Sequence, residues 1–466
     1  MTVALARWIP LTQLTELSFE DAPRIIVKPP GPKSQALLAK QSLLETRATI
    51  YNKAFPLAID SAKGATIKDV DGNLFIDWIS GISVLNLGHN NPALADAAAS
   101  QMSKIWHALE IPTTARLNFL EKIHSILPSG LNGHARALLT VTGGDACETA
   151  ISLARHVTGK RTIICFEGAY HGVHQGIISA TSSRHHLESS GTSRHEVFHL
   201  PFPYPYRFPL PCEKRGDEAK VVLRYLEHLI LDEESGLDNP AGIIVEPIQG
   251  EGGYIVPPSD FLPGLREIAD KYQIPLIIDE VQTGFGRTGK FWGCSLTDTP
   301  PDIMCISKSV GAGIPLSLIA YREEYDQDLP PGFHLGTYRG NPIAMAVGAA
   351  SIDYIKRENI LDRVTRLGQK AKLRFEQIGN ASQNVGDVRG VGFMIGNEIV
   401  QSKQTRAPSK EMTVKLRNLM FENGLLMHTC GHSGNVLRFI APLILSENLL
   451  EKGLEVYETA VKQASL

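Results

Sequence analysis

The 466-residue sequence lacks the features of a nucleic-acid-binding, membrane or secreted protein. Its formal net charge is only -3 at pH 7, which provides no basic surface for nucleic acid or for an anionic membrane. No apolar run approaches membrane-spanning length, and the first residues show the pattern of neither a signal peptide nor a transit peptide. We therefore expect a cytoplasmic protein that acts on a small molecule, with no nucleic-acid partner and no membrane partner.

Paired cysteines are also lacking. The six cysteines are scattered, without a CxxC pair and without a His/Cys cluster at the spacing of a zinc site. We expect each to be a free thiol and no metal to be bound. What the chain does contain is 43% hydrophobic residues, an ordinary globular proportion. A chain of this length is expected to form one large domain and a smaller one.

Short apolar runs rich in β-branched residues alternate with amphipathic stretches through the middle of the chain, which is α/β patterning. Because these runs are apolar nearly throughout, they predict strands buried on both faces, as in a parallel or mixed sheet covered by helices. The runs span residues 137–141, 162–166, 242–245, 275–278, 303–306 and 316–320.

The two ends of the chain have a different pattern. From residue 343 onward, apolar residues at three-to-four spacing predict long helices with short strands between them. An Asp71-Gly72 turn signal predicts a hairpin in the opening segment, which we expect to pack with the C-terminal part. We predict an N-terminal arm and part of a small domain in 1–90, a large domain in 91–345 and a C-terminal small domain in 346–466.

Residues that could take part in catalysis or ligand binding follow the predicted strands. In open α/β sheets, ligands bind beyond the carboxyl ends of the strands, so one site could hold all of these residues. They are Thr142, Gly143 and Gly144, then Tyr170 and His171, then Glu246, then Asp279 and Glu280, and finally Ser307 and Lys308.

Taken singly, these residues have ordinary interpretations. Gly143 and Gly144 before a helix offer open N–H groups to a phosphate, but glycines there are as often a tight turn. Lys308 among small neighbours suits Schiff-base chemistry, although a solvated loop lysine is the commoner case. Asp279 could equally be a helix cap. Their combination favours chemistry, because a carboxylate can keep a pyridine nitrogen protonated while a lysine forms an imine.

A dinucleotide-binding fingerprint, G-x-G-x-x-G, occurs at residues 284–289. It does not follow a strand directly and does not lead into a clear helix. An acidic residue that ends a second strand about 20 residues further on is also missing. The sequence therefore disfavours a nicotinamide enzyme.

The sequence resembles the class III aminotransferases, which are pyridoxal 5'-phosphate enzymes of fold type I. Within that family it is most similar to the 4-aminobutyrate and ornithine aminotransferase-like members. The central match is LIIDEVQTGFGRTGKFW at 276–292, followed by PDIMCISKSVGAGIPLS at 301–317. Further matches include VTGGDACETAISLAR, AYHG, IIVEPIQGEGG, GTYRGNPIA and VLRFIAPL. The resemblance implies a large cofactor-binding domain with a mostly parallel sheet, a smaller α+β domain from the N- and C-terminal segments, and a homodimer with shared active sites.

The resemblance also implies roles for individual residues. Lys308 and Asp279 would be catalytic: Lys308 would hold the cofactor as a Schiff base and shuttle a proton, and Asp279 would pair with the pyridine nitrogen. Arg438 would grip a substrate carboxylate with a two-pronged contact, Glu251 would screen that arginine when another substrate binds, and Ile82 would touch the substrate's far end. The other cofactor-binding residues would be Gly143, Gly144, Tyr170, His171, Glu246, Val281, Gln282 and, reaching the neighbouring subunit's phosphate, Thr337.

An aminotransferase that moves an amino group from an amine or ω-amino acid to a 2-oxo acid is the function that the resemblance implies. A pyridoxal phosphate-dependent racemase or epimerase on the same scaffold is the alternative, whereas a non-catalytic binding protein is disfavoured by Lys308 and Asp279. Some stretches depart from the family pattern. VHQGIIS follows AYHG where an Arg-Thr continuation is common, and residues 182–196 are rich in histidines, which we expect to be solvated. These departures leave the substrate open.

Overall fold

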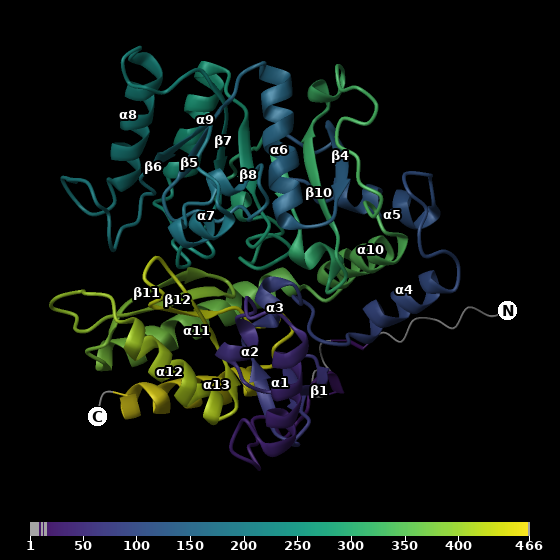
Figure 1. The fold of residues 1–466 in the computed structure, drawn as a ribbon, viewed down its shortest axis with the longest axis vertical. Helices are drawn as coiled ribbons and strands as arrows, with labels where there is room; N and C mark the ends of the chain where they lie inside the picture. Colours follow the sequence, from purple (N-terminus) through teal and green to yellow (C-terminus); the bar gives the residue numbers. More distant parts are fainter. Residues whose placement is uncertain (1–8, 11–12, 14–15, 465–466) are drawn as a thin grey trace. The chain divides into compact units, whose positions relative to one another are not determined.

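The computed structural model describes residues 9–10, 13 and 16–464, and the chain divides into two compact units (Figure 1). The first unit takes in the chain up to Asp96 and from Tyr354 onward, and the second unit spans Ala97–Asp353. Two helices, α4 (Pro92–Met102) and α10 (Pro342–Arg357), contain the points at which the chain passes between the units. Among the described residues, no helix is long and apolar enough to cross a bilayer.

A seven-stranded sheet forms the centre of the second unit, in the order β4-β10-β9-β8-β7-β5-β6. Strands β5 to β9 pair in parallel, whereas β10 is antiparallel to both of its neighbours. The α/β fold with a mostly parallel sheet is thus confirmed. The strands are β4 (Ala135–Thr140), β5 (Thr162–Phe166), β6 (Val197–Leu200), β7 (Pro240–Val245), β8 (Leu276–Asp279), β9 (Ile303–Ile306) and β10 (Ser317–Arg322).

Helix α6 (Gly143–Thr158) packs closely on this sheet. Ala146, Ala150 and Ala154 line one face of the helix and are fully buried in the same cluster as residues of β5, β7, β8 and β9. Small side chains let the helix backbone approach the sheet, which fixes where the helix begins. The other helices of this unit are α5 (Thr114–His124), α7 (Arg184–Ser190), α8 (Glu218–Leu231) and α9 (Phe261–Tyr272).

The first unit combines the N- and C-terminal segments in two four-stranded sheets. In one of them, β13 (Leu425–Leu426) runs parallel to β3 (Leu74–Asp77), so the C-terminal segment completes the sheet of the N-terminal hairpin. Trp78 anchors the core, with its ring 4.8 Å from that of Phe439. The remaining strands are β1 (Ile59–Lys63), β2 (Thr66–Asp69), β11 (Val385–Val391), β12 (Met394–Ile399), β14 (His428–Cys430) and β15 (Val436–Phe439).

The helices of the first unit are α1 (Pro32–Leu44), α2 (Tyr51–Ala54), the irregular turn α3 (Ser80–Ser83), α11 (Ile360–Ala381), α12 (Lys410–Glu422) and α13 (Glu447–Ala464). The C-terminal ones, α11 to α13, follow the long amphipathic patterns of the sequence. Gly453 lets α13 approach the core, because a Cβ at that position would lie 2.2 Å from the Trp78 indole.

Candidate active site

Asp279 is a buried acid of the second unit whose side chain accepts several hydrogen bonds. It ends β8 and is 3% exposed. Its Oδ2 accepts hydrogen bonds from Nδ1 of His171 at 2.7 Å and from Sγ of Cys147 at 3.3 Å. Its Oδ1 accepts from the backbone N–H of Val281 at 3.0 Å. Three elements therefore converge on one carboxylate: the end of β8, the loop after β5 and the first turns of α6.

The protonation of this cluster follows from its contacts. Burial opposes a charge on His171, but the hydrogen bond and the negative charge of Asp279 outweigh burial and raise the pKa of His171 from 6.5 to about 10. A hydrogen bond with Cys305, burial and the charge of Asp279 raise the pKa of Cys147, so its thiol keeps the proton that it donates. At neutral pH, the Asp279 side chain is thus held by an imidazolium and by a thiol that keeps its proton.

Lys308 follows β9, the strand next to β8. Asp279 pairs directly with Cys305 across these two strands, which places Lys308 three residues beyond the pairing point. The backbone of Lys308 has a φ of 51°, a left-handed conformation that costs a non-glycine residue on the order of 1 kcal/mol. Backbone strain of this kind persists where the surrounding structure imposes it, and here buried Ser307 and Ser309 flank the lysine.

The N-terminus of α6 has open backbone donors of the kind that suit a phosphate. Thr142 caps the helix by accepting from the N–H of Asp145, and the helix itself has no acceptor for the N–H groups of Gly143 and Gly144. A Cβ on Gly143 would lie 2.9 Å from Cγ1 of Val281 and 3.6 Å from Cβ of Ser307. Glycine therefore keeps the helix start open, beside both Val281, two residues after Asp279, and Ser307, the residue before Lys308.

Glu246 connects the remaining strand ends. Its Oε1 accepts from the N–H of Tyr170 at 3.1 Å, and its Oε2 accepts from the N–H of Gly250 at 2.8 Å. Burial, reinforced by the charge of Asp279 and opposed by that of His171, raises the pKa of Glu246 to about 7. The side chain of Gln282 lies against Gly250, where a Cβ would come within 2.8 Å of it. Glu246 is thus hydrogen-bonded to Tyr170 and, through Gly250, is connected to Gln282.

Thr337 lies in an exposed segment of the second unit. Its carbonyl accepts from Nε2 of His107 at 2.7 Å. Arg339, two residues on, is 6% exposed and pairs with Asp145 of α6 at 2.6 Å. The segment that contains Thr337 is therefore fastened to the first turn of α6.

The sequence also predicted two substrate residues in the first unit, and each has an unusual local setting. Arg438 lies on β15 and is 1% exposed. Ile82 lies in α3, where Ser80, Gly81, Ile82 and Ser83 have φ values of 43°, 60°, 60° and 65°. A β-branched residue in the left-handed region is a true outlier, of the kind that clusters at ligand sites.

The sequence analysis missed two residues of the second unit, one that contacts Asp279 and one that contacts Tyr170. Cys147, expected to be simply a free thiol, donates to Asp279. His186 was expected to be solvated, but it is half-buried and its ring lies 5.7 Å from that of Tyr170. Cys147, His171 and Asp279 also have the mutual spacing of metal ligands, within 4.8 Å. Direct hydrogen bonds among these three already use the atoms that a metal would need.

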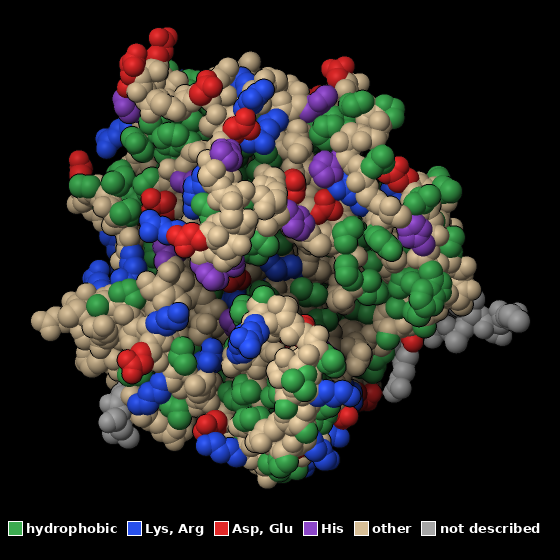
Figure 2. All heavy atoms as spheres, viewed as in Figure 1, with side chains coloured by type: hydrophobic (Ala, Val, Ile, Leu, Met, Phe, Trp, Pro, Cys, Tyr) green, Lys and Arg blue, Asp and Glu red, His purple; other side chains and the backbone are tan. Residues whose placement is uncertain are grey.

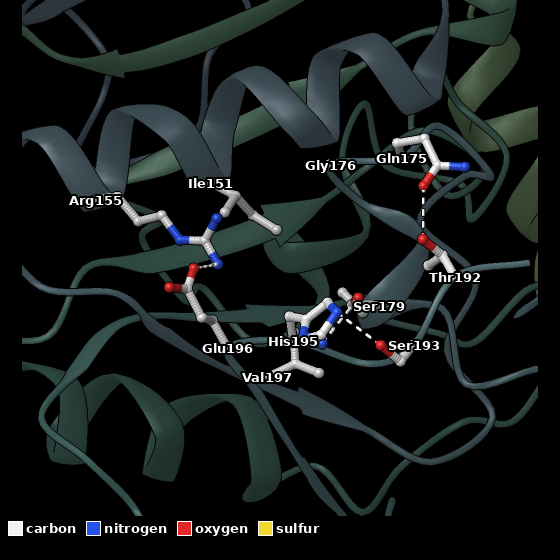
Figure 3. Close-up of a pocket in the computed structure, with 11 residues that line it drawn as sticks. Ile151, Arg155, Gln175, Gly176, Ser179, Thr192, Ser193, His195, Glu196 and Val197 are labelled. Atoms are coloured by element: carbon white, nitrogen blue, oxygen red, sulfur yellow. Dashed lines mark hydrogen bonds and ion pairs between the residues drawn. The ribbon is translucent and has the colours of Figure 1, made fainter.

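A hollow on the second unit is lined by α6 and by residues of the segments 175–180 and 192–197 (Figure 3). Thr192 donates to Oε1 of Gln175 at 2.8 Å, and Arg155 pairs with Glu196 at 3.3 Å. His195 is exposed and bonds to Ser193 at 2.7 Å. The charges of the hollow neutralise each other, and its contacts fasten the loop that carries α7 and His186.

Comparison with known proteins agrees with this geometry. Residues 49–461 match the family Aminotransferase class-III. A diaminobutyrate–2-oxoglutarate aminotransferase of Rhizobium meliloti is 36% identical over 420 residues, which cover 88% of this chain and 89% of that protein. An alanine/serine racemase of Pyrococcus horikoshii is 35% identical over 96% of this chain and 94% of its own length. An amine transaminase from an uncultivated Pseudomonas species, solved in its pyridoxal phosphate-bound form, has a TM-score of 0.82 and 28% identity, covering 90% of this chain and 98% of that one.

The residues of the second unit fit this cofactor. The open helix start at Gly143 suits a phosphate, the carboxylate of Asp279 suits a ring nitrogen, and Lys308 lies one strand away from that carboxylate. Nε2 of His171 is buried and has no hydrogen-bond partner among the described atoms, so a polar group next to Asp279 is left for a bound molecule to satisfy. The chain therefore belongs to the class III aminotransferase family, and it is a transaminase that uses pyridoxal 5'-phosphate.

Proposed function

We propose that this transaminase takes its amino group from a primary amine or ω-amino acid and delivers it to a 2-oxo acid. The observation that carries the proposal is the buried Asp279 and His171 pair, one strand away from Lys308. Transamination needs a lysine and an acid against one cofactor ring. The substrate classes are supported by the relative named for diaminobutyrate and 2-oxoglutarate, an amine donor and a 2-oxo acid.

Each strand-end residue has a proposed part in the reaction. The cofactor supplies an aldehyde that condenses with amines and a ring that accepts electrons when a bond next to the nitrogen breaks. Lys308 would take the proton from Cα of the donor and deliver it to C4' of the cofactor, because an uncharged primary amine can act first as a base and then, once protonated, as an acid. Asp279 would keep the ring nitrogen protonated, and the imidazolium of His171 would hold the Asp279 side chain in a fixed direction through their hydrogen bond.

The other contacts would orient the ring. Gly143 and Gly144 would donate to the phosphate, and Val281 and Tyr170 would cover the two ring faces. Gln282 would bind the ring hydroxyl, with Glu246 lining the pocket beside it.

The same site must accept two substrates in turn. Arg438 would bind the carboxylate of the 2-oxo acid through both guanidinium prongs, and Glu251 would cover that charge when the other substrate carries no carboxylate there. Ile82 would contact the distal end of the donor, and its strained turn would hold it in place.

We further propose that the enzyme is a homodimer. The segments 102–117 and 335–341 of the second unit lie side by side, because His107 donates to Thr337 and Asn341 donates to the carbonyl of Trp106. Figure 2 shows hydrophobic side chains gathered on this part of the surface. A second copy of the chain would cover them and bring Thr337 to its partner's phosphate. The exposed residues are Met102, Ile105, Trp106, Leu109, Ile111, Leu117, Leu335 and Tyr338.

The test of the proposed function is a pair of half-reactions. The purified holoenzyme is incubated with single amines, and its spectrum is followed as the pyridoxal form becomes the pyridoxamine form. A 2-oxo acid should then restore the first spectrum and release the corresponding amino acid. Failure of every amine and amino acid to produce the pyridoxamine form would overturn the proposal.

A racemase is the second candidate, because one relative bears that name. Racemisation needs a proton donor on the ring face opposite the lysine, and His186 beside Tyr170 is a described side chain to test in that role. Chiral chromatography of alanine and serine after incubation with the holoenzyme distinguishes the two activities. Inversion without any pyridoxamine form would favour the racemase. The cytoplasmic location stays a prediction.

A further inference from the structure

Arg339 contacts the first turn of α6, the helix whose N-terminus is proposed to bind the phosphate of the cofactor. We infer that Arg339 is a positioning residue that compensates the negative charge of Asp145 and thereby lets this helix end receive the phosphate. The inference rests on the proposed binding of the phosphate by Gly143 and Gly144. It adds to the site a residue that lies 194 positions further along the chain than Asp145.

Asp145 places a carboxylate at the same helix end. It lies in the first turn of α6, directly after Gly143 and Gly144. Its Oδ2 accepts a hydrogen bond from the backbone N–H of Val141 at 2.9 Å, so the side chain is folded back toward the start of the helix. The helix dipole stabilises an acid in this place, but the same positive end is needed by the phosphate. Without compensation, the two negative groups would repel each other.

The guanidinium of Arg339 binds the other oxygen of that carboxylate. Its Nη2 donates to Oδ1 of Asp145 at 2.6 Å. The side chain of Arg339 is 6% exposed and that of Asp145 is 19% exposed, so solvent screens this ion pair only weakly. Gly336 leaves space for the arginine, because a Cβ there would lie 2.6 Å from its Nε. Both oxygens of Asp145 are thus engaged, one by the chain entering the helix and one by a cation.

Arg339 is also held by its own segment. Its Nη1 donates to the carbonyl of His334, and its Nη2 lies 2.6 Å from Nδ1 of the same histidine. A guanidinium can only donate, so Nδ1 presents its lone pair; burial and the charge of Arg339 lower the pKa of His334 and favour that neutral form. The hydroxyl of Thr149, 3.4 Å from this nitrogen, donates to the carbonyl of Asp145 at 2.7 Å. Nη2 carries two hydrogens and therefore serves Asp145 and His334 together.

A purely structural role makes a different prediction. If the ion pair only fastens residues 334–339 to α6, its loss should lower the Tm and weaken the binding of all cofactor analogues alike. If Arg339 compensates Asp145, its loss should weaken only ligands that carry a phosphate, and removal of the Asp145 charge should restore their binding. Pyridoxal, which lacks the phosphate of pyridoxal 5'-phosphate, separates the two cases.

The measurement uses the full-length apoenzyme and needs no turnover. Pyridoxal 5'-phosphate and pyridoxal are titrated separately while the visible absorbance is followed, which gives a Kd for each. We expect Arg339→Gln to raise the Kd of pyridoxal 5'-phosphate about tenfold and to leave that of pyridoxal within about twofold. The double variant with Asp145→Asn should return the Kd of pyridoxal 5'-phosphate to within about threefold of the unmodified value. Asp145→Asn alone should bind pyridoxal 5'-phosphate at least as tightly as the unmodified protein.

Arg266→Gln is the matched control. Arg266 pairs with buried Asp302 at 2.8 Å, and Asp302 accepts from the N–H of Leu276, which begins β8 at the edge of the sheet opposite to Asp279. This variant should lower the Tm and leave both Kd values unchanged.

The outcomes separate the inference from the phosphate site on which it rests. An unchanged Kd of pyridoxal 5'-phosphate in Arg339→Gln, an equal loss for pyridoxal, an equal loss in Arg266→Gln, or no recovery in the double variant would overturn the inference. Weaker binding of pyridoxal 5'-phosphate by Asp145→Asn would overturn it as well. If the unmodified protein binds pyridoxal as tightly as pyridoxal 5'-phosphate, the proposed phosphate site itself is wrong, whereas a preference for the phosphate that Arg339→Gln leaves intact refutes only the role of Arg339.

Discussion

Replacing Asp279 with Asn should inactivate the enzyme without unfolding it, and the structure gives the reason. The rise in the pKa of His171 from 6.5 to about 10 corresponds to about 5 kcal/mol in favour of the charged imidazole. Asp279 supplies the hydrogen bond and the negative charge behind that preference. Without them, burial makes His171 neutral at pH 7.5, so that no lone charge is left inside the protein.

The rate should fall because an amide cannot keep the ring nitrogen protonated. Loss of one charge-assisted contact in the transition state costs about 3 kcal/mol, so we expect kcat to decrease by about a hundredfold or more. The assay is the single-turnover conversion of the pyridoxal form by an amine, measured together with cofactor content. A variant that carries cofactor and turns over within threefold of the unmodified enzyme would refute the assignment of Asp279.

Glu280→Gln is the matched control for this experiment. Glu280 is the next residue and is equally buried, but its carboxylate accepts from the backbone N–H groups of Gly293 and Cys294 and from Thr283. Its contacts are structural, so the variant should have a lower Tm and keep most of its kcat in the folded fraction. The two neighbouring acids thus separate a chemical role from a stabilising one.

Further predictions concern pH, the carboxylate site and the assembly. The pKa of His171 is higher in the folded protein than in the unfolded chain, so its contribution to apoenzyme stability is complete below about pH 6.5 and is lost as the pH rises through about 10. The free energy of unfolding, measured with urea, should therefore fall between about pH 7 and 10, and a constant value would contradict this. Arg438→Lys should cost on the order of 2 kcal/mol in kcat/KM for the 2-oxo acid, measured by stopped-flow absorbance. Glu251→Gln should slow the amine half-reaction and leave the 2-oxo acid half-reaction intact or faster, and an equal loss in both would make Glu251 structural. Light scattering should give twice the 50.9 kDa chain mass or a multiple of it, and Trp106→Glu should yield inactive monomers; a fully active monomer would refute the dimer.

The sheet and the residues at its strand ends could be predicted because parallel strands buried on both faces are apolar nearly throughout. The predicted run 303–306 is β9 itself, and the predicted run 275–278 differs from β8 by one residue at each end. Lys308 and Asp279 follow from this pattern, because the carboxyl ends of parallel strands lie at one edge of the sheet. The resemblance then added roles that no pattern of hydrophobicity contains.

The residues that were missed depend on packing rather than on pattern. Cys147 contacts Asp279 because the alanines of α6 let the helix lie close to the sheet, which cannot be read from a single thiol in a sequence. Arg339 reaches Asp145 over Gly336, where a Cβ would lie 2.6 Å from Nε of the arginine. This glycine and this arginine both lie in GTYRGNPIA, but nothing in that stretch indicates an ion pair with a residue 194 positions earlier.

The most direct test of the central claim is the absorbance of the enzyme with Lys308 replaced by Ala. The purified unmodified protein should be yellow from cofactor bound through Lys308, and the variant should lose that visible band together with nearly all turnover. Lys290→Ala, an exposed lysine of the same unit, is the control and should keep both. A Lys308→Ala protein that retains the band and normal turnover would contradict the account.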